Sequence, residues 1–275
     1  MPQYIRINHK EGLVFHTAQR QRLGQLAYDD HGARWSYCWI NEDVSAGEYV
    51  EDMANADLLS GATGTVTTAS AAGTNTLIDS GEFTGDDFVG ALGSTLGDTI
   101  ANGGGQGFHV TEMIDANTLG VSVHHGDADP TLTGNGWETA TTTSTTYSLW
   151  FPGRCKQGDD QPAIVRGFVQ VDVDVSENEF GWVKQTSAGW VKIDTSDTGV
   201  PVAGEWLVPQ AAGLVSGLTH AATTADEVSQ QIAQCITGDL AGVVDGLVFA
   251  NLHVRNDAVS MRFPRISHPY NEVTI

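Results

Sequence analysis

The sequence predicts an all-β protein: an antiparallel β-sandwich or β-barrel domain with a second, small β-barrel inserted into it. Apolar and polar residues alternate over short stretches, which places successive side chains on opposite faces of a strand. The 32 glycines and the runs of Thr, Ser and Ala suit many short strands joined by turns. With 275 residues, 40% of them hydrophobic, the chain can bury the core of one large or two modest domains.

A change in composition marks the inserted domain. Residues 59–161 are rich in Thr, Ala, Gly and Asp and poor in Lys and Arg. We therefore expect a discontinuous main domain formed by residues 1–58 and 162–275, with extended terminal arms. Insertions of this kind are accommodated at surface loop tips.

The first part of the chain predicts a β-hairpin. Met1–Phe15 has no clear period and is either an edge strand or a free arm. Leu23–Tyr28 can form a short strand, and Asp29–Gly32 has the composition of a tight turn. Arg34–Trp39 then alternates polar and aromatic residues, which predicts a strand with one aromatic face.

The inserted block contains a second hairpin. Phe108–Ile114 and Leu119–His125 are joined by Asp115–Thr118, which has a typical turn composition. Thr145–Phe151 is a further predicted strand, and we expect it to end at Pro152-Gly153.

The stretch Gly167–Asp194 is the most regular part of the sequence. Every second residue of Phe168–Val175 is valine, and Phe180–Gln185 and Trp190–Ile193 also alternate. Short polar turns separate the three stretches. We predict a three-strand antiparallel meander that repeats Trp-Val-Lys across a hairpin.

The last third predicts three more strands and a tail. The strands are expected within Pro201–Val208, Leu214–Leu218 and Gly246–Arg255. For residues 225–237, periodicity leaves helix and strand equally open. The final residues contain two prolines in little regular pattern and are expected to leave the domain as an extended arm.

Charge and cysteine usage limit the partners. The net charge is −21, from 13 Lys and Arg against 34 Asp and Glu, so the surface repels phosphate and we expect no nucleic-acid partner. A simpler explanation of the net negative charge is that it keeps the protein soluble. The three cysteines are far apart, which predicts reduced thiols and folding in a cytoplasm. No signal peptide and no apolar run of about 20 residues is present, so we expect no membrane partner.

Catalytic and metal-binding patterns give little support for an enzyme. The chain lacks HExxH, GxSxG and P-loop motifs. His124 and His125 are adjacent in a predicted strand and point to opposite faces, so a polar strand end is favoured over a metal site. Asp172 and Asp174 lie about 7 Å apart along a strand, as in a glycosidase pair, but a solvated strand face explains them better. We expect no catalytic residues, metal or cofactor.

The tryptophans are candidate core or contact residues. Trp35, Trp39, Trp182 and Trp190 are expected to anchor a core or an interface. Trp137 lies in the turn-like stretch 134–137 and is the candidate for an exposed binding loop. The alternative is that this loop is tucked onto its own barrel.

Two segments resemble a known group of proteins. The first is Leu23–Tyr37 followed by Val44–Gly47, with a Leu-Gly, an Asp-Gly turn interrupted by His31, an aromatic strand and an Ala-Gly turn. The second is Phe180–Lys192 followed by Gly199–Pro209. Together they resemble the head decoration (cement) proteins of tailed bacteriophages, particularly of cyanophages and other marine phages, over about half of the chain.

The resemblance implies a non-enzymatic structural virion protein on the capsid exterior, made in the host cytoplasm. It would bind the major capsid protein, cement neighbouring capsomers, and form a homo-oligomer, either a dimer or a trimer. The terminal arms are then the expected capsid contacts, with ordinary edge-strand packing as the alternative explanation. The candidate contact residues are Tyr4, Ile5, Phe15, Phe263, Ile266 and Tyr270. A rival function is a spike, turret or tail-associated protein whose inserted barrel binds a host glycan.

Overall fold

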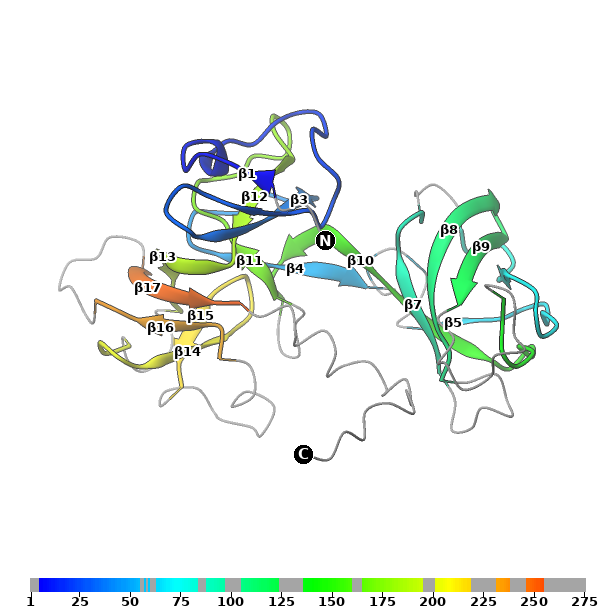
Figure 1. The fold of residues 1–275 in the computed structure, drawn as a ribbon. Helices are drawn as coiled ribbons and strands as arrows, with labels where there is room; N and C mark the ends of the chain where they lie inside the picture. Colours follow the sequence, from blue (N-terminus) through cyan, green and yellow to red (C-terminus); the bar gives the residue numbers. More distant parts are fainter. Residues whose placement is uncertain are drawn as a thin grey trace, which may run out of the picture. The chain divides into compact units, whose positions relative to one another are not determined.

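The computed structural model describes residues 5–54, 57, 59, 63–83, 88–96, 105–123, 136–159, 165–194, 201–218, 231–237 and 246–254. The fold is all-β, which confirms the predicted fold class (Figure 1). The chain forms two compact units, with boundaries between Asp52 and Met53 and between Pro152 and Gly153. Strands β4 (Tyr49–Ala54) and β10 (Thr146–Gln157) each cross one boundary.

The first unit contains a closed barrel of five strands. Their order is β3 (Arg34–Ile40), β12 (Phe180–Lys184), β11 (Val165–Phe168), β4 and the second half of β10. Strands β3 and β12 are antiparallel, whereas β10 returns to β3 in parallel, with Cys155 opposite Ile40. Closing a sheet in this way removes its exposed edges.

Apolar side chains and one ion pair fill the barrel. The apolar cluster consists of Phe15, Cys38, Ile40, Val44, Val50, Cys155, Val169, Val173 and Val183. Arg166 donates from Nε to Asp52 Oδ1 at 2.8 Å and from Nη2 to Asp52 Oδ2, and both side chains are buried. Burial lowers the pKa of Arg166, but the charge and hydrogen bonds of Asp52 outweigh it and raise that pKa above its ordinary value.

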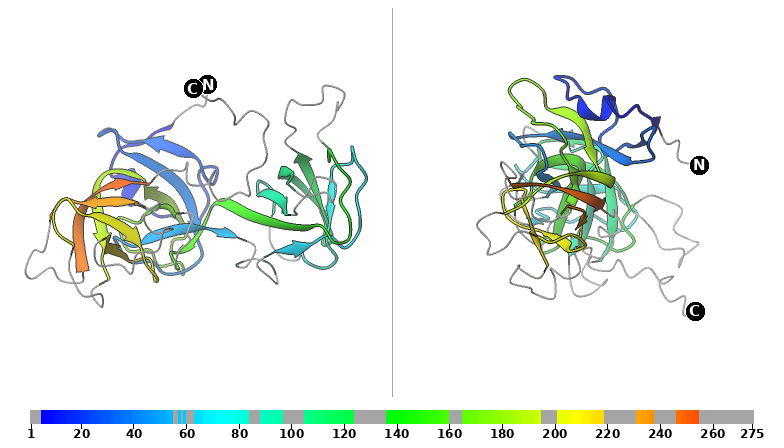
Figure 2. Two further views of the ribbon diagram at one scale, coloured as in Figure 1. Left: turned by 90° about the horizontal axis from the view of Figure 1, so that it is seen from below. Right: turned by 90° about the vertical axis from the view of Figure 1, so that its left-hand side faces the viewer.

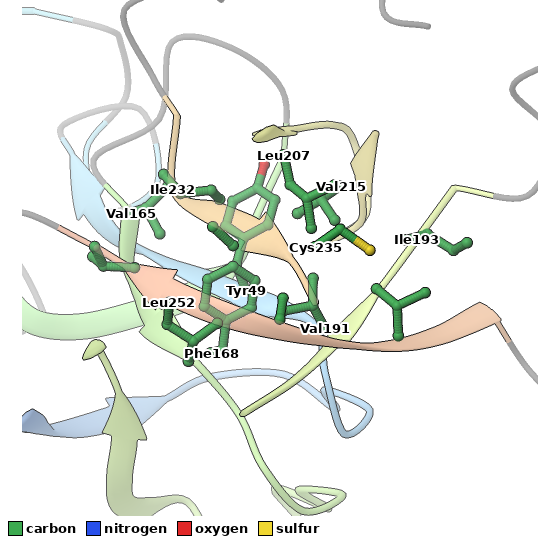
Figure 3. Packing of buried hydrophobic residues seen from close by; sticks show 14 residues of the cluster. Tyr49, Val165, Phe168, Val191, Ile193, Leu207, Val215, Ile232, Cys235 and Leu252 are labelled. Carbon is green, nitrogen blue, oxygen red and sulfur yellow. The ribbon is translucent and has the colours of Figure 1, made fainter. Parts of the chain in front are cut away.

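A five-stranded antiparallel sheet packs on the barrel within the first unit. Its order is β13 (Thr186–Lys192), β17 (Leu247–His253), β16 (Ala233–Cys235), β14 (Trp206–Pro209) and β15 (Val215–Gly217). The barrel contributes Tyr49 and Phe168 to the shared core, with ring centroids 6.4 Å apart (Figure 3). The left-hand view of Figure 2 shows β16 and β17, both in orange, side by side.

The second unit has its own sheet, in the order β10 (first half), β7 (Leu92–Leu96), β8 (Gly107–Asp115), β9 (Thr118–Val123) and β6 (Thr76–Ile78). The short strand β5 (Gly64–Thr65) also pairs with β10. The largest fully buried side chains of the second unit are mostly aromatic and include Phe83, Phe88, Phe108, Trp137 and Tyr147.

Both predicted hairpins are confirmed. Strand β2 (Leu26–Tyr28) pairs with β3 across the turn at Asp29–Gly32, and β8 pairs with β9. The three cysteines are free and buried, as predicted. In the stretch 225–237, Ala233–Cys235 is the strand β16, whereas 225–230 lies outside the described residues.

The predicted meander over Gly167–Asp194 is wrong. Strand β12 pairs with β3 and β11 in the barrel, and β13 instead pairs with β17 in the other sheet. Residues 169–175 follow β11 without continuing it, apart from an isolated bridge between Val44 and Val173. Val169 and Val173 are nevertheless buried, so the alternation reports burial and not strand pairing.

The predicted strand end at Pro152-Gly153 is also wrong, because β10 continues to Gln157. Gly153 has a φ of 83°, a backbone conformation that glycine adopts without steric cost. A Cβ at this position would collide with the backbone nitrogen of Gly24, and the Gly153 N–H donates to Asp52 Oδ1 at 2.9 Å.

Candidate interaction surface

The basic residues of this acidic protein are concentrated at its beginning. Residues 1–22 contain four of the 13 Lys and Arg but one of the 34 Asp and Glu, namely Glu11. The four are Arg6, Lys10, Arg20 and Arg22. The remaining residues carry all of the excess negative charge. We refer to residues 5–22 as the N-terminal basic segment.

The cations of the N-terminal basic segment are exposed, and none forms an ion pair with the residues that the structure describes. The later basic residues that the structure describes contact the protein itself. Lys156 and Lys192 form ion pairs with Glu51 and Glu48 at 3.4 and 2.8 Å. The others bind a carboxylate, a carbonyl oxygen or an aromatic ring: Arg34, Arg154, Arg166 and Lys184. Within the described residues, the positive charges free for a partner are therefore those of residues 6–22, whereas Arg255, Arg262 and Arg265 lie outside that part of the chain.

The N-terminal basic segment is held against the barrel. Strand β1 (Ile5–Arg6) pairs in parallel with β2, and the 3-10 helix η1 (Glu11–Leu13) follows it. His16 and Phe180 exchange backbone hydrogen bonds of 2.7 and 2.9 Å. The described part of Met1–Phe15 thus contains an edge strand and is not a free arm.

Two glycines let this segment approach the barrel closely. A Cβ at Gly181 would lie 2.5 Å from Phe15 Cδ1, so the Phe15 ring lies directly on the β12 backbone. A Cβ at Gly12 would lie 3.0 Å from the ring of Trp35. Trp35 belongs to the aromatic face that β3 was predicted to have, together with Tyr37. The aromatic face therefore serves as the platform for the segment.

A basic pocket of about 340 Å³ lies between the N-terminal basic segment and strands β3 and β12. It is lined by Asn8, Lys10, Glu11, Val14, His16, Arg20, Gln21, Tyr37 and Trp182. Partial burial lowers the pKa of His16, and the charge of Arg20 lowers it further, while Glu11 raises it. The positive charges of Lys10 and Arg20 in the lining of this pocket favour an acidic group from a partner.

The predicted contact residues have different environments. Ile5 is half-buried and packs beside Trp35 and Tyr37. Phe15 is 9% exposed and lies in the barrel cluster, so its side chain is not presented to a partner as the contact prediction requires. Tyr4, Phe263, Ile266 and Tyr270 lie outside the described residues. The exposed cations were missed, although the charge imbalance of residues 1–22 was visible in the sequence.

The prediction that Trp137 is an exposed binding residue is wrong. Its side chain is completely buried, with the ring edge-to-face against Phe108 at 5.3 Å. Its indole N–H donates to the carbonyl of Thr76 at 2.8 Å. The loop is tucked onto its own unit because a large aromatic side chain with a satisfied N–H is stable in a core.

The candidate catalytic pair has a local role in the structure. Asp172 and Asp174 are exposed; Asp172 accepts from the Ala46 N–H at 2.8 Å, and Asp174 accepts from the backbone and hydroxyl of Ser176. Both carboxylates therefore stabilise turns. Among the described residues, no group of three His, Cys, Asp or Glu is placed to hold a metal, and His124 and His125 are not among them.

No helix in the described part of the chain has the length and apolar character needed to cross a membrane. Comparison of the chain with protein-family models, curated proteins and solved structures gave no match.

Proposed function

We propose that this chain is a structural protein of the virion that decorates the exterior of a tailed-phage capsid. It binds the major capsid protein as a homo-oligomer and stabilises the shell without catalysing a reaction. The observation that carries the proposal is the N-terminal basic segment: a set of exposed cations, on an otherwise acidic protein, that form no ion pair with the described residues.

The segments that resemble decoration proteins support the same assignment. Their described residues form β2, β3, β12, β13 and β14, which all belong to the first unit. The N-terminal basic segment packs on two of these strands, β3 and β12. The resemblance and the candidate contact surface therefore lie in the same part of the fold.

Electrostatics favours an acidic partner surface for this segment. A protein with a net charge of −21 repels acidic surfaces everywhere except where its own positive charge is concentrated. The acidic remainder of the surface would face away from the shell and its DNA. Opposite charges across an interface set orientation and association rate more than affinity.

Such contacts are individually weak. An exposed ion pair contributes ~0.2–1 kcal/mol and is screened by salt. An oligomer that engages several capsid subunits multiplies such contacts through its effective local concentration. We expect binding to the shell to weaken as the salt concentration rises.

The test uses purified particles with and without the protein. Particles that lack it should release DNA at a lower temperature and in a milder osmotic shock than complete particles. Adding the purified full-length protein back should restore their resistance. Equal survival of depleted and complete particles would refute the cementing role.

A charge-matched pair of variants isolates the contact surface. Lys10→Gln with Arg20→Gln removes two positive charges from the basic pocket. Thr68→Glu with Ala72→Glu changes the net charge equally at exposed positions of the second unit. The first variant should fail to bind depleted particles and the second should bind; equal binding would exclude the basic segment as the contact.

The rival function, a glycan-binding spike, rested on an exposed Trp137. Because Trp137 is buried, the inserted block has lost the residue that motivated this role. Binding of the second unit to a glycan array would revive it.

A further inference from the structure

A second pocket of about 340 Å³ lies in the first unit. The side chains that matter for its chemistry are His9, Asp29, Gln170, Lys184, Trp190 and Phe249. They come from the N-terminal basic segment, the β2–β3 turn, β12, β13, β17 and the residues after β11. The pocket is thus built by segments that are far apart in the sequence.

Lys184 is buried, and its described neighbours only partly compensate the loss of hydration of its ammonium group. It is 5% exposed, and its Nζ donates to the Ala188 carbonyl at 2.6 Å and lies 5.3 Å from the centroid of the Trp35 ring. Within the described residues, no carboxylate lies within ion-pair distance of it. Burial lowers its pKa, and the more distant charge of Asp29 offsets this only in part. An anion in the pocket would supply the missing partner.

Asp29 is already fully engaged and orients His9. Its Oδ1 accepts from the backbone N–H groups of His31 and Ala33 at 2.9 and 2.8 Å. Its Oδ2 accepts from the Trp35 indole at 3.0 Å and from His9 Nδ1 at 3.2 Å. Since an ionised carboxylate only accepts, His9 Nδ1 carries the hydrogen and Nε2 is left for a ligand.

The same pocket has an exposed aromatic wall. Trp190 is 47% exposed, and its ring lies edge-to-face with Phe249 at 5.2 Å. Gln170 fixes its backbone, accepting from the Trp190 N–H at 3.0 Å and donating to the Trp190 carbonyl at 3.2 Å. A Cβ at Gly189 would lie 2.8 Å from Gln170 Oε1, so the hydrogen bonds between Gln170 and the Trp190 backbone depend on glycine at position 189.

We propose that this pocket binds a carboxylated sugar, with the carboxylate at Lys184 and the sugar ring against Trp190. The buried ammonium donates a charge-assisted hydrogen bond to the carboxylate, and His9 Nε2 contacts a sugar hydroxyl, which can donate or accept. A sugar ring presents C–H groups to an exposed indole face, while its other hydroxyls remain hydrated. A plain carboxylate would leave the aromatic wall unused, and a neutral sugar would leave Lys184 uncompensated.

The probes are glucuronate, glucose and acetate, titrated into the full-length protein. Binding is followed by tryptophan fluorescence and by NMR of the ligands. Glucuronate should bind at least about tenfold more tightly than either of the other two. Absence of glucuronate binding, or glucose or acetate binding as tightly, would overturn the proposal.

Variants identify the pocket. Trp190→Ala should weaken glucuronate binding by about tenfold or more, whereas Ile236→Ala, at a position also 47% exposed but outside the pocket, should not. Lys184→Met should abolish the preference for glucuronate over glucose. Because Lys184 is buried, its variant is first checked for folding by circular dichroism; if it is unfolded, Trp190→Ala and the probe series decide. Unchanged binding by Trp190→Ala would refute the site.

Discussion

The two units each bury an aspartate in a different way. In the first unit, Asp52 is paired with Arg166 and also accepts from the Gly153 N–H. In the second unit, Asp79 accepts from the Tyr147 hydroxyl at 2.8 Å and from the Thr65 N–H at 3.2 Å, and no cation is paired with it among the described residues. Burial raises the pKa of Asp79, because these two hydrogen bonds compensate only part of its desolvation.

The different environments of these two aspartates indicate that the interior of the first unit depends on a buried ion pair and that of the second unit does not. Removing one member of a buried ion pair leaves the other charge uncompensated, whereas a carboxyl group with neutral partners can take up a proton. The barrel should therefore be sensitive to the loss of a single charge. The second unit should depend mainly on aromatic packing and neutral hydrogen bonds.

The largest effect is expected for Arg166→Met. It should lower the free energy of unfolding by about 3–5 kcal/mol, because Asp52 stays buried without its cation. Urea unfolding measures the loss in the free energy of unfolding, and hydrogen exchange at β4 and β11 shows whether the barrel is the part that is destabilised. Adding Asp52→Leu should recover most of the loss; a cost below about 1 kcal/mol for the single variant would contradict this description.

A smaller effect is expected for Tyr147→Phe in the second unit. The loss should be about 1–2 kcal/mol, because one hydrogen bond to Asp79 disappears while the aromatic ring remains. Urea unfolding measures it, with hydrogen exchange at β7 and β10. A cost equal to that of Arg166→Met would show that the second unit is no less dependent on one polar contact.

Two aspartates should give opposite pH dependences. Burial raises the pKa of Asp29, but the hydrogen bonds from Trp35, Ala33, His9 and His31 outweigh it and leave that pKa below its ordinary value of 3.8. The stability that Asp29 contributes is present above 3.8 and is lost as the pH falls through its lower folded value. Asp79, with a raised pKa, contributes stability below 3.8 that is lost as the pH rises through its folded value.

The measurement compares wild type with Asp29→Asn and with Asp79→Asn by urea unfolding between about pH 3 and 7. The advantage of wild type over Asp29→Asn should shrink towards low pH. Its advantage over Asp79→Asn should shrink towards high pH. Slopes of the same sign would contradict the contrast between the two carboxyl environments.

The smallest effect on stability is expected for Lys10→Gln with Arg20→Gln. Because both cations are exposed and form no ion pair with described residues, the free energy of unfolding should change by less than about 0.5 kcal/mol. The same variant should lose binding to depleted particles. A marked loss of stability would mean that these residues hold the fold and are not reserved for a partner.

Local patterns predicted the fold class and the hairpins well. The turn at Asp29–Gly32 and the turn between β8 and β9 are specified by neighbouring residues, so the sequence suffices. Pairing between distant strands is different. The Trp-Val-Lys repeat predicts strands correctly at β12 and β13, but nothing local tells β13 to pair with β17, about 60 residues away along the chain.

The candidate surface was harder to predict than the fold. Phe15 and Trp137 are apolar residues in irregular stretches, and both are buried. Phe15 packs where Gly181 has no side chain, and Trp137 is stable in the core because its indole N–H donates to the Thr76 carbonyl. Exposure depends on such tertiary details. The charge imbalance of residues 1–22, by contrast, needed only counting.

The docking of Phe15 on Gly181 has a consequence for synthesis of the chain. Phe15 packs on a strand that is made about 165 residues later, after residues 53–152 of the second unit. At ordinary translation speeds, that interval is roughly 10–30 s. During this time the N-terminal basic segment lacks its docking strand, so it can pack on the barrel only after β12 has been made.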